Sequence, residues 1–505
     1  MMSHWIIAPV VLPAVMGAFI VLTMRHDLLL QRVFSIAATG ALAVISLALL
    51  WAASVNPPEV YRLGNWPAPF GIVLMLDRLS AVMVALTAFL ALAVQIYSAS
   101  TGWDTRGRHF HALWQFQLMG VCGAFLTADA FNLFVFFEVL LIASYGLMIH
   151  SGGRDRLRAG VQYVAYNLVG STLFLFALAT IYSITGTLNM ADIAGKVAAL
   201  PEQDWAMIRV GAILLILVFA IKGALVPMQF WLPATYANAP GPVAALFAVM
   251  TKVGAYAMIR TGTLMFPPAT PATGTFLSDL ILIAALLTLA VGAIGVLGAR
   301  SLGWLVAFAA IASMGTLFVA ISQFTPEATA AALYYTLHST LAAAILFLVA
   351  DLVADRRAHL RLTEALPPIA RSGLIAALFF AGAIAMAGMP PLSGFLGKLM
   401  ILDATRGDSM ALIWSVILAT SLITIVGLSR AGSVLFWKAH ASTPEEPAET
   451  KDEPLSFAAV FLLIAGLVAL TVFAGPVMGW MEATAANLHD PSSYIGANAL
   501  VEVGK

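Results

Sequence analysis

Five ionisable residues stand in stretches of sequence that are otherwise almost entirely apolar: Glu138, Lys222, Lys252, His338 and Lys398. A charged side chain at the centre of a membrane-spanning helix costs roughly 2.5–3.5 kcal/mol on insertion scales, so residues in such positions are candidates for function. A carboxyl group, an amine and an imidazole can each take up and release a proton, and the imidazole does so near neutral pH. These residue types in apolar surroundings predict proton transfer along a buried row.

Electrostatic coupling between the carboxylate and a lysine would allow such a row to pass protons from one residue to the next. A buried lysine without a partner tends to lose its proton, whereas a nearby carboxylate stabilises the charged form. We therefore expect Glu138 and Lys222 to form a bistable pair that breaks when a proton arrives, with Lys252, His338 and Lys398 as later stations. The alternative is structural: Glu138 bonded to a neighbouring helix, the lysines as fixed counter-charges, and His338 as a neutral hydrogen-bonding residue between helices.

Four further charged residues lie nearer the ends of the predicted helices: Asp77, Arg78, Asp351 and Arg430. Charged groups at the membrane interface keep contact with water and are far less costly than those at the centre. We expect these four to be interfacial anchors or pairs, and a role in ion access is the alternative.

The elements that must position these residues are membrane-spanning helices. Of the 505 residues, 61% are hydrophobic and 10% are charged, and the mean hydropathy is +0.95; soluble domains carry roughly 25% charged residues. Because backbone groups in lipid must be satisfied within the segment, and no alternating strand pattern occurs, we expect an all-α polytopic membrane protein. Runs of about 20 apolar residues predict about fourteen spans, at 5–24, 30–54, 72–99, 110–127, 130–150, 159–185, 207–232, 241–265, 277–298, 302–322, 328–352, 372–404, 411–437 and 455–480.

Proline interrupts two of these helices close to a lysine. In AIKGALVPMQFWLP (220–233) the lysine precedes two prolines, and in AMAGMPPLSGFLGKLM (385–400) two prolines precede the lysine. Proline removes a backbone donor and frees a carbonyl, and such a defect survives in a membrane only where protein or water covers it. Paired broken helices in two halves of a transporter indicate an inverted repeat with an ion path near the midplane. A simple packing kink is the alternative.

Basic residues in the predicted loops are distributed unevenly. Fourteen fall on one side and six on the other, the poorer side holding Arg62, Lys196, Arg209, Arg260, Arg406 and Lys505. Cytoplasmic loops carry the excess of Lys and Arg. We therefore expect a multi-pass protein of a bacterial inner membrane with both termini outside the cytoplasm.

Motifs for cofactor chemistry are absent from the sequence. The single cysteine, Cys122, is expected to be a small packing residue and allows neither an intramolecular disulfide nor a cluster held by about four thiolates. No metal-binding, dinucleotide-binding or phosphate-binding motif occurs, so we expect no cofactor and no bound metal. The charged segment 439–454 is expected to be a solvated loop.

Three stretches resemble the antiporter-like subunits shared by respiratory complex I and the Mrp-type cation/proton antiporters. They are LFVFFEVLLIASYGLM (133–148), AIKGALVPMQFWLPATYANAPGPVAALFAVMTKVGAYAMIR (220–260) and GMPPLSGFLGK (388–398). The combination comprises a glutamate in the fifth helix, a lysine in a broken seventh, a lysine in the eighth and a broken twelfth. The resemblance covers roughly residues 70–440, and the segment NAPGPVAALFAVMTKVGAYAMIR (238–260) is most similar to the D-type subunit of the Mrp antiporters.

The resemblance implies a fold and a division of the chain. That family has fourteen helices built around two inverted five-helix units. Helices 1–3 would occupy 1–109, a first repeat of helices 4–8 would occupy 110–265, a second inverted repeat of helices 9–13 would occupy 277–437, and helix 14 with the tail would occupy 455–505. Two departures from the family pattern occur. Ala234 stands where many relatives have an acidic residue, and GWLVAF (303–308) stands where many have a basic-Leu-Leu-Ala-Tyr stretch. The second departure removes a charge that could help gate the second half, so it puts the exact relay near helix ten in doubt.

Three functions remain open at this point. The resemblance implies a subunit of a multisubunit antiporter that exchanges a monovalent cation, Na⁺ first, for protons, with other hydrophobic subunits and membrane lipids as partners and no nucleic acid. The runner-up is a proton-pumping subunit of a complex I-like quinone reductase or of a membrane-bound hydrogenase. A scaffold that conducts nothing is the third, and the number of buried ionisable residues argues against it.

Overall fold

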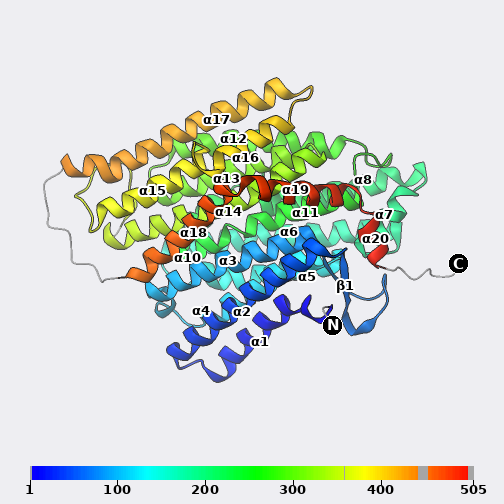
Figure 1. Ribbon diagram of the computed structural model, residues 1–505, viewed down its shortest axis with the longest axis horizontal. Helices are drawn as coiled ribbons and strands as arrows, with labels where there is room; N and C mark the ends of the chain where they lie inside the picture. The colour runs from blue at the N-terminus through cyan, green and yellow to red at the C-terminus, as the bar shows by residue number, and fades with distance from the viewer. Residues whose placement is uncertain (1–2, 358, 442–452, 499–505) are drawn as a thin grey trace.

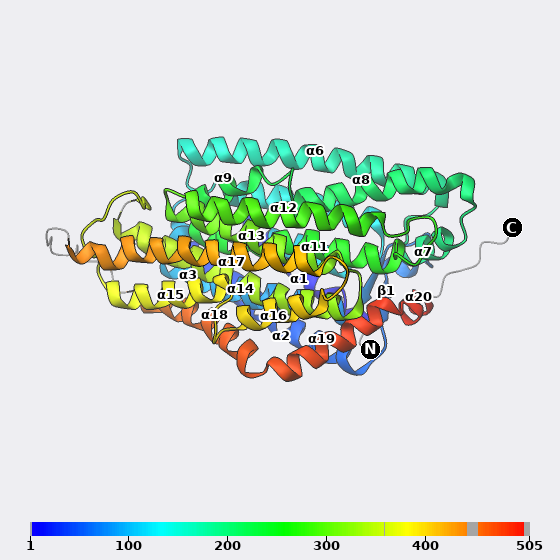
Figure 2. The same cartoon turned by 90° about the horizontal axis from the view of Figure 1, so that it is seen from above.

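The computed structural model describes residues 3–357, 359–441 and 453–498, and its helices run roughly along one common direction (Figure 1, Figure 2). The α-helices are α1 (Ala8–Thr23), α2 (Leu28–Val55), α3 (Arg78–Ser100), α4 (Phe110–Leu126), α5 (Ala130–Met148), α6 (Arg154–Thr185), α7 (Met190–Ala198), α8 (Trp205–Gly223), α9 (Trp231–Asn238), α10 (Gly241–Phe247), α11 (Met250–Arg260), α12 (Phe276–Gly298), α13 (Leu302–Ile321), α14 (Pro326–Arg357), α15 (Ser372–Ala387), α16 (Ser393–Ala404), α17 (Met410–Gly432), α18 (Pro454–Val472), α19 (Ala474–His489) and α20 (Ser492–Asn498).

Eleven helical segments in the described part of the chain are long and apolar enough to cross a membrane, and α1 and α15 are shorter apolar helices. Their outer surfaces are apolar: Leu29 of α2, Leu168 of α6 and Leu422 of α17 are all exposed. Large exposed apolar surfaces mark contact with lipid or with apolar protein partners, and the length of these helices indicates a membrane. The chain is therefore an all-α polytopic membrane protein, as the composition predicts.

Polar side chains mark where several helices begin. Asp27 accepts a hydrogen bond from the backbone of Leu30 at the start of α2 (3.1 Å), and Asp129 accepts one from Asn132 at the start of α5 (2.7 Å). At the start of α3, Asp77 and Ser80 bond reciprocally to each other's backbone N–H. Such caps satisfy the free N–H groups of a first turn. They fix the starts of α2, α3 and α5, and α5 carries Glu138.

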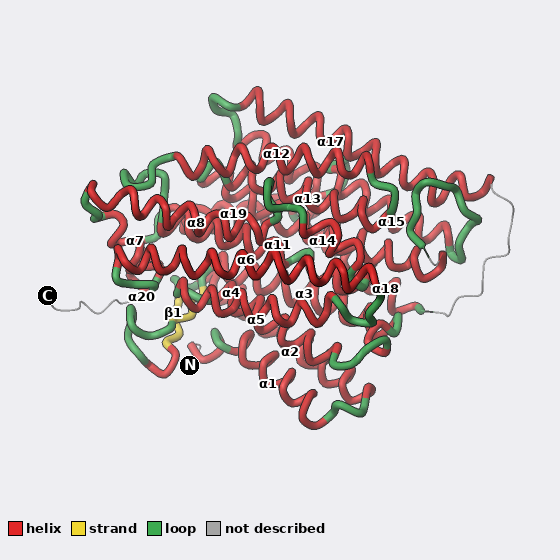
Figure 3. Tube along the Cα trace, turned by 180° about the vertical axis from the view of Figure 1, so that it is seen from behind, coloured by secondary structure: helices red, strands yellow, loops and turns green. Residues whose placement is uncertain are grey.

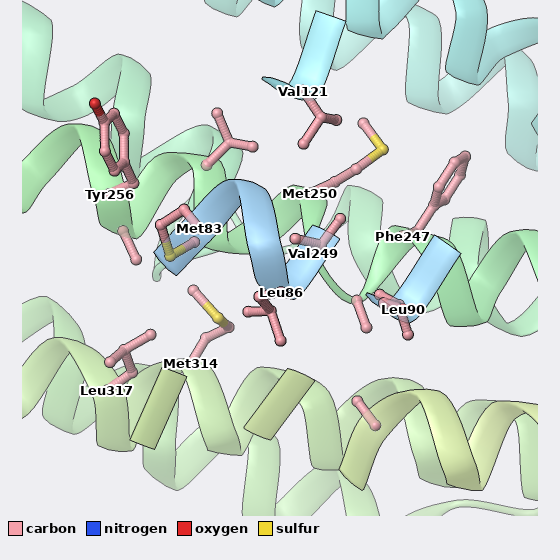
Figure 4. Close-up of a cluster of buried hydrophobic side chains, with 14 of the residues drawn as sticks. Met83, Leu86, Leu90, Val121, Phe247, Val249, Met250, Tyr256, Met314 and Leu317 are labelled. Carbon is pink, nitrogen blue, oxygen red and sulfur yellow. The ribbon is translucent and has the colours of Figure 1, made fainter. Parts of the chain in front are cut away.

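The centre of the molecule is formed by α3, α11, α13 and α14. All eleven residues of α11 are buried, and Figure 4 shows Met83 and Leu86 of α3 beside Met314 of α13 and Tyr256 of α11. Glycines allow close approach on the flank of this core. A Cβ on Gly292 of α12 would lie 2.4 Å from the backbone nitrogen of Ala312 in α13, so these two helices pack backbone to backbone, as small residues permit in membranes.

One end of the bundle carries the first and the last described residues, a short antiparallel sheet, α7 and α20, and we call it the terminal face (Figure 1, Figure 3). Strands β1 (Glu59–Arg62) and β2 (Val73–Leu76) pair with Glu59 opposite Leu76. The opposite face is formed by the loops around 101–109, 149–153, 299–301 and 359–371. There, the backbones of Ser301 and Arg361 form an isolated antiparallel β-bridge.

The structure confirms both predicted breaks and corrects three expectations. Helix α8 ends at Gly223 and α9 begins at Trp231, while α15 ends at Ala387 and α16 begins at Ser393. The predicted span 72–99 begins with β2 rather than with helix, and the predicted eighth helix, 241–265, is interrupted between α10 and α11. Arg260, predicted as a loop residue, is 3% exposed within α11 because it pairs with a buried carboxylate. Most of the predicted loop 439–454 lies outside the described residues.

Candidate functional site

Glu138 and Lys222 line one small cavity between α5, α6 and α8. Its volume is about 10 Å³, and Asn167, Ser171 and Phe174 of α6 complete the wall. A cavity of roughly 10–15 Å³ holds about one water molecule. The Ser171 hydroxyl donates a hydrogen bond to the Glu138 carboxylate. The structure thus brings together the two residues that the sequence pairs.

The lysine side of this cavity lacks a direct partner. Lys222 is 3% exposed, and its Nζ has no hydrogen-bond partner in the part of the chain that the structure describes. The ammonium lies 5.9 Å from the ring centroid of Phe137. No ion pair within 4.0 Å joins Lys222 to Glu138 among the described residues, so the predicted pair is adjacent but open.

The break after Lys222 is held by a local contact. Ala224 has a left-handed backbone (φ 56°), which ends α8, and the indole Nε1 of Trp231 donates to the carbonyl of Ile221 at 2.9 Å. A helix end inside a membrane protein leaves carbonyls without partners unless another group bonds them. Trp231 therefore stabilises the broken helix one residue away from the lysine.

Lys252 lies apart from the first pair, in α11. It is 2% exposed, and within the described residues the hydrogen-bond partner of its Nζ is the thioether Sδ of Met314 at 3.3 Å. A thioether is a weak acceptor. The amine is therefore buried with almost no polar stabilisation, which is costly unless the group has a function.

His338 of α14 contacts the second broken helix, and Lys398 belongs to it, in α16. His338 of α14 is completely buried, its Nδ1 lies 2.9 Å from Ser393 Oγ at the start of α16, and its Nε2 has no partner among the described residues. Lys398 donates to the carbonyl of Ala387 and to Ser421 Oγ, both at 2.8 Å. A cation at the carbonyl end of a helix is stabilised by the helix dipole, so Lys398 caps α15.

The five predicted residues therefore form two groups and one separate residue. Glu138 and Lys222 share a cavity, His338 and Lys398 share a break, and Lys252 is separate, buried in α11. Within the described ranges, no direct hydrogen bond joins any two of the five. A relay through all five needs water molecules or side-chain movements between the stations.

The charges near helix ends form contacts that anchor the ends, as expected. Asp351 accepts hydrogen bonds from Tyr97 Oη (2.8 Å) and Trp103 Nε1 (2.9 Å) and lines a cavity of about 410 Å³ at the opposite face. Arg78 donates to the carbonyl of Ser54, and Arg430 to that of Ala299. These residues fix the loops that connect the helices.

Sequence reasoning missed the partner of Asp77. Its carboxylate forms two short contacts to the Arg260 guanidinium, at 2.6 and 2.9 Å, and the side chains are 11% and 3% exposed. Arg260 was counted among the loop residues although it lies inside the predicted span 241–265, and a charge inside a span is the signal that indicates a buried partner. The two residues are 183 positions apart, so only the fold pairs them.

A second missed ion pair stabilises the opposite face. Asp104 accepts two hydrogen bonds from Arg32 (2.6 and 2.7 Å) and lies 3.0 Å from His111 Nε2. Burial by itself raises the pKa of the Asp104 carboxyl, but the bonds from Arg32 and His111 outweigh it, and the pKa lies below its ordinary value. This carboxylate ties the loop between α3 and α4 to α2 and α4.

Known proteins match the chain along most of its length. A family model described as NADH:quinone oxidoreductase/Mrp antiporter, transmembrane region, matches residues 127–424. A probable K⁺/H⁺ antiporter D-type subunit of Rhizobium meliloti is 38% identical over 98% of this chain and 97% of the relative, and an Na⁺/H⁺ antiporter D-type subunit of Bacillus subtilis is 36% identical over 98% and 99%.

Solved structures show the same fold. A chain of the Mrp complex from Dietzia sp. is 26% identical, with a TM-score of 0.88 over 98% of this chain and 99% of that one. An archaeal membrane-bound sulfane sulfur reductase contains a chain with a TM-score of 0.89 at 22% identity over 98% of this chain and 99% of that one, which is a likeness of fold alone. By sequence and by fold, this chain belongs to the antiporter-like family of NADH:quinone oxidoreductases and Mrp antiporters, and within it to the branch of the Mrp D-type subunits.

Proposed function

We propose that this chain is the proton-translocating subunit of a multisubunit antiporter that exchanges a monovalent cation for protons. The observation that carries the proposal is the position of Glu138 and Lys222 on one water-sized cavity beside a broken helix. Relatives along nearly the whole chain are named as Na⁺/H⁺ and K⁺/H⁺ antiporter subunits, which supports a monovalent cation. Na⁺ is the first cation to test.

The first step involves the carboxylate and the amine at that cavity. While Glu138 is ionised, it stabilises a charged Lys222 across the cavity, and the Ser171 hydroxyl holds the carboxylate in place. A proton that binds Glu138 removes this stabilisation, so Lys222 releases its own proton toward the centre of the protein. One net proton then moves past the first broken helix.

The later steps use the three remaining residues. Lys252 receives the proton in surroundings with no strong acceptor, so it does not hold the proton tightly. His338 and Lys398 lie at the second break, where the polar atoms of Ser393 and Ala387 are within hydrogen-bond distance of them. The sequence Glu138, Lys222, Lys252, His338 and Lys398 is our proposed order.

The two broken helices also support a division of the chain into repeats. We propose a first unit at 110–265 and a second, inverted unit at 277–437, flanked by 1–109 and 455–505. The family match, 127–424, extends across both breaks. The terminal face would lie outside the cytoplasm, because Arg106, Arg108 and Arg154 lie at the opposite face.

Native purification from bacterial membranes through a tag on this chain tests the assembly. We expect other hydrophobic membrane subunits, no flavin or iron–sulfur protein, and proton flux in proteoliposomes that depends on Na⁺ or K⁺. Co-purified redox subunits, with proton movement driven by electron transfer, would replace the proposal with the complex I-like pump. Proton flux without any cation dependence would contradict the exchange of a cation.

A further inference from the structure

A cavity of about 240 Å³ opens at the terminal face between α3, α11 and the C-terminal helices α19 and α20. Its mouth is exposed at Asn56 and Asn487, and its floor is made of the buried side chains of Arg260 and Tyr494. Both polar and apolar atoms line it. A volume of this size has room for several water molecules.

The floor carries the Asp77–Arg260 ion pair and two buried polar atoms without a protein partner. Arg260 Nε and Tyr494 Oη form no hydrogen bond within the described residues, although their side chains are 3% and 4% exposed. Buried polar atoms are nearly always hydrogen-bonded, to protein or to ordered water. Two unsatisfied atoms on residues that line one cavity indicate that water reaches its floor.

The same helix connects this floor to the proposed relay. Lys252, Tyr256 and Arg260 follow each other at intervals of four residues in α11, so they share one face of the helix. Eight residues correspond to about 12 Å along an α-helix. The Arg260 guanidinium lies 5.5 Å from the ring centroid of Tyr256, and Lys252 contacts Met314. A π-helical turn, Thr261–Met265, follows Arg260 directly.

The short interval between Lys252 and the ion pair is apolar. In Figure 4, Met83 lies beside Tyr256, and Met314 and Leu317 of α13 lie on the far side of Met83. The Tyr256 hydroxyl donates a hydrogen bond to the carbonyl of Phe125 at 2.7 Å. Methionine side chains are flexible and adopt alternative packings at low cost. This dry segment would pass protons only when the methionines move aside and water enters.

We propose that this cavity is the water-filled passage between the relay and the terminal face, and that Asp77 is the station at which protons enter or leave that water. When a proton leaves by this passage instead of moving on to His338, an N–H bond of Lys252 breaks and an O–H bond of Asp77 forms through intervening water, and Asp77 then releases the proton to the cavity; a proton that enters takes the same steps in reverse. Arg260 stays protonated and is a positioning residue that holds the carboxylate at the floor. The inference rests on the proposed function, and it identifies the route by which the relay is connected to one side of the membrane.

Cysteine labelling tests the passage. The only native cysteine, Cys122, is buried, and Cys122→Ala provides a cysteine-free chain. Into this background we would place Asn487→Cys at the mouth, and Glu202→Cys as a matched exposed position at the terminal face outside the cavity. A membrane-impermeant cationic methanethiosulfonate added at the terminal face should lower cation-dependent proton flux at least fivefold in the first variant and leave the second unchanged.

Each other outcome of the labelling has a defined meaning. Complete labelling of Asn487→Cys without loss of proton flux, or no labelling at all, would contradict the proposed passage. If Asn487→Cys is inactive before labelling, the measurement is repeated with Asn56→Cys. Absence of cation-dependent flux in the unlabelled wild-type complex would instead overturn the proposed function itself, and this inference with it.

A charge-neutral double substitution separates proton exchange from structural support. Asp77→Asn alone leaves Arg260 buried and unpaired, whereas Asp77→Asn with Arg260→Gln removes both charges and restores stability. We expect the double variant to assemble like the wild type but to lose proton flux at least tenfold, and Asp77→Glu to retain most of it. Asp192→Asn, which breaks a surface pair with Lys196, is the control. Wild-type flux in the double variant would assign the pair a structural role only.

Discussion

Substitution of Asp104 by Asn should destabilise the chain through one identifiable contact. The carboxylate has no exposed side-chain area, accepts two bonds from Arg32 and contacts His111. Breaking a buried ion pair by removing one partner costs about 3–5 kcal/mol. Arg32 is 30% exposed, so water partly compensates, and we expect a loss of about 2–3 kcal/mol, below that range.

The assay is the temperature at which half of the purified complex is lost, followed by fluorescence-detected size-exclusion chromatography. Unfolding of membrane complexes is commonly irreversible, so this temperature serves as the measure of stability. Glu364→Gln is the matched control, because its contact to Arg361 is long (3.8 Å) and exposed at the same face. Asp104→Asn should lower the temperature by several degrees and the control by less than about one degree.

The pH dependence of this difference follows from the direction of the pKa shift. Because the folded-state pKa of Asp104 lies below the ordinary 3.8, its contribution is fully present above that value and is lost as the pH falls through the folded pKa. The difference between wild type and Asp104→Asn should not fall between pH 8 and pH 5 and should shrink below about pH 4. A difference that disappears between pH 7 and pH 5 would refute the reasoning.

Further substitutions test the other stations and the packing. Lys252→Met should abolish cation-dependent proton flux in proteoliposomes while leaving the half-loss temperature unchanged or higher, because the amine gives up no strong bond; a large fall in stability would contradict this. His338→Ala should slow flux without stopping it, and an unchanged rate would return His338 to a structural role. Lys398→Met should both stop flux and cost about 1–3 kcal/mol, since it leaves the end of α15 unbonded; Lys398→Arg should recover part of the stability. Gly292→Leu should reduce the yield of assembled complex, because even a Cβ there meets the backbone of α13.

The features that depend on local chemistry could be predicted from the sequence. Proline and its missing donor predict both broken helices, and the scarcity of charge predicts the spans. Glu138 and Lys222 could be paired in advance because two opposite charges in a low-dielectric region stabilise each other. The open distance between them could not be predicted, since it depends on the packing of α5, α6 and α8.

Features that depend on distant contacts were not predictable in the same way. The interruption between α10 and α11 contains no proline: the backbone N–H groups of Ala248 and Val249 donate to carbonyls three positions back instead of four, which makes a tighter turn. The pairing of Asp77 with Arg260 depends on two helices meeting, and Lys398 was predicted as a relay residue without its contacts to Ala387 and Ser421. Sequence patterns indicate which residues are unusual, whereas the fold determines their partners.

The most direct test of the proposed function is proton flux through the complex with Glu138→Ala, measured in proteoliposomes with an imposed Na⁺ or K⁺ gradient. The matched control is Glu202→Ala, an exposed glutamate at the terminal face. We predict that Glu138→Ala assembles normally and loses cation-dependent proton flux, while the control retains it. Flux equal to wild type in the assembled Glu138→Ala complex would contradict the relay through the cavity that Glu138 shares with Lys222.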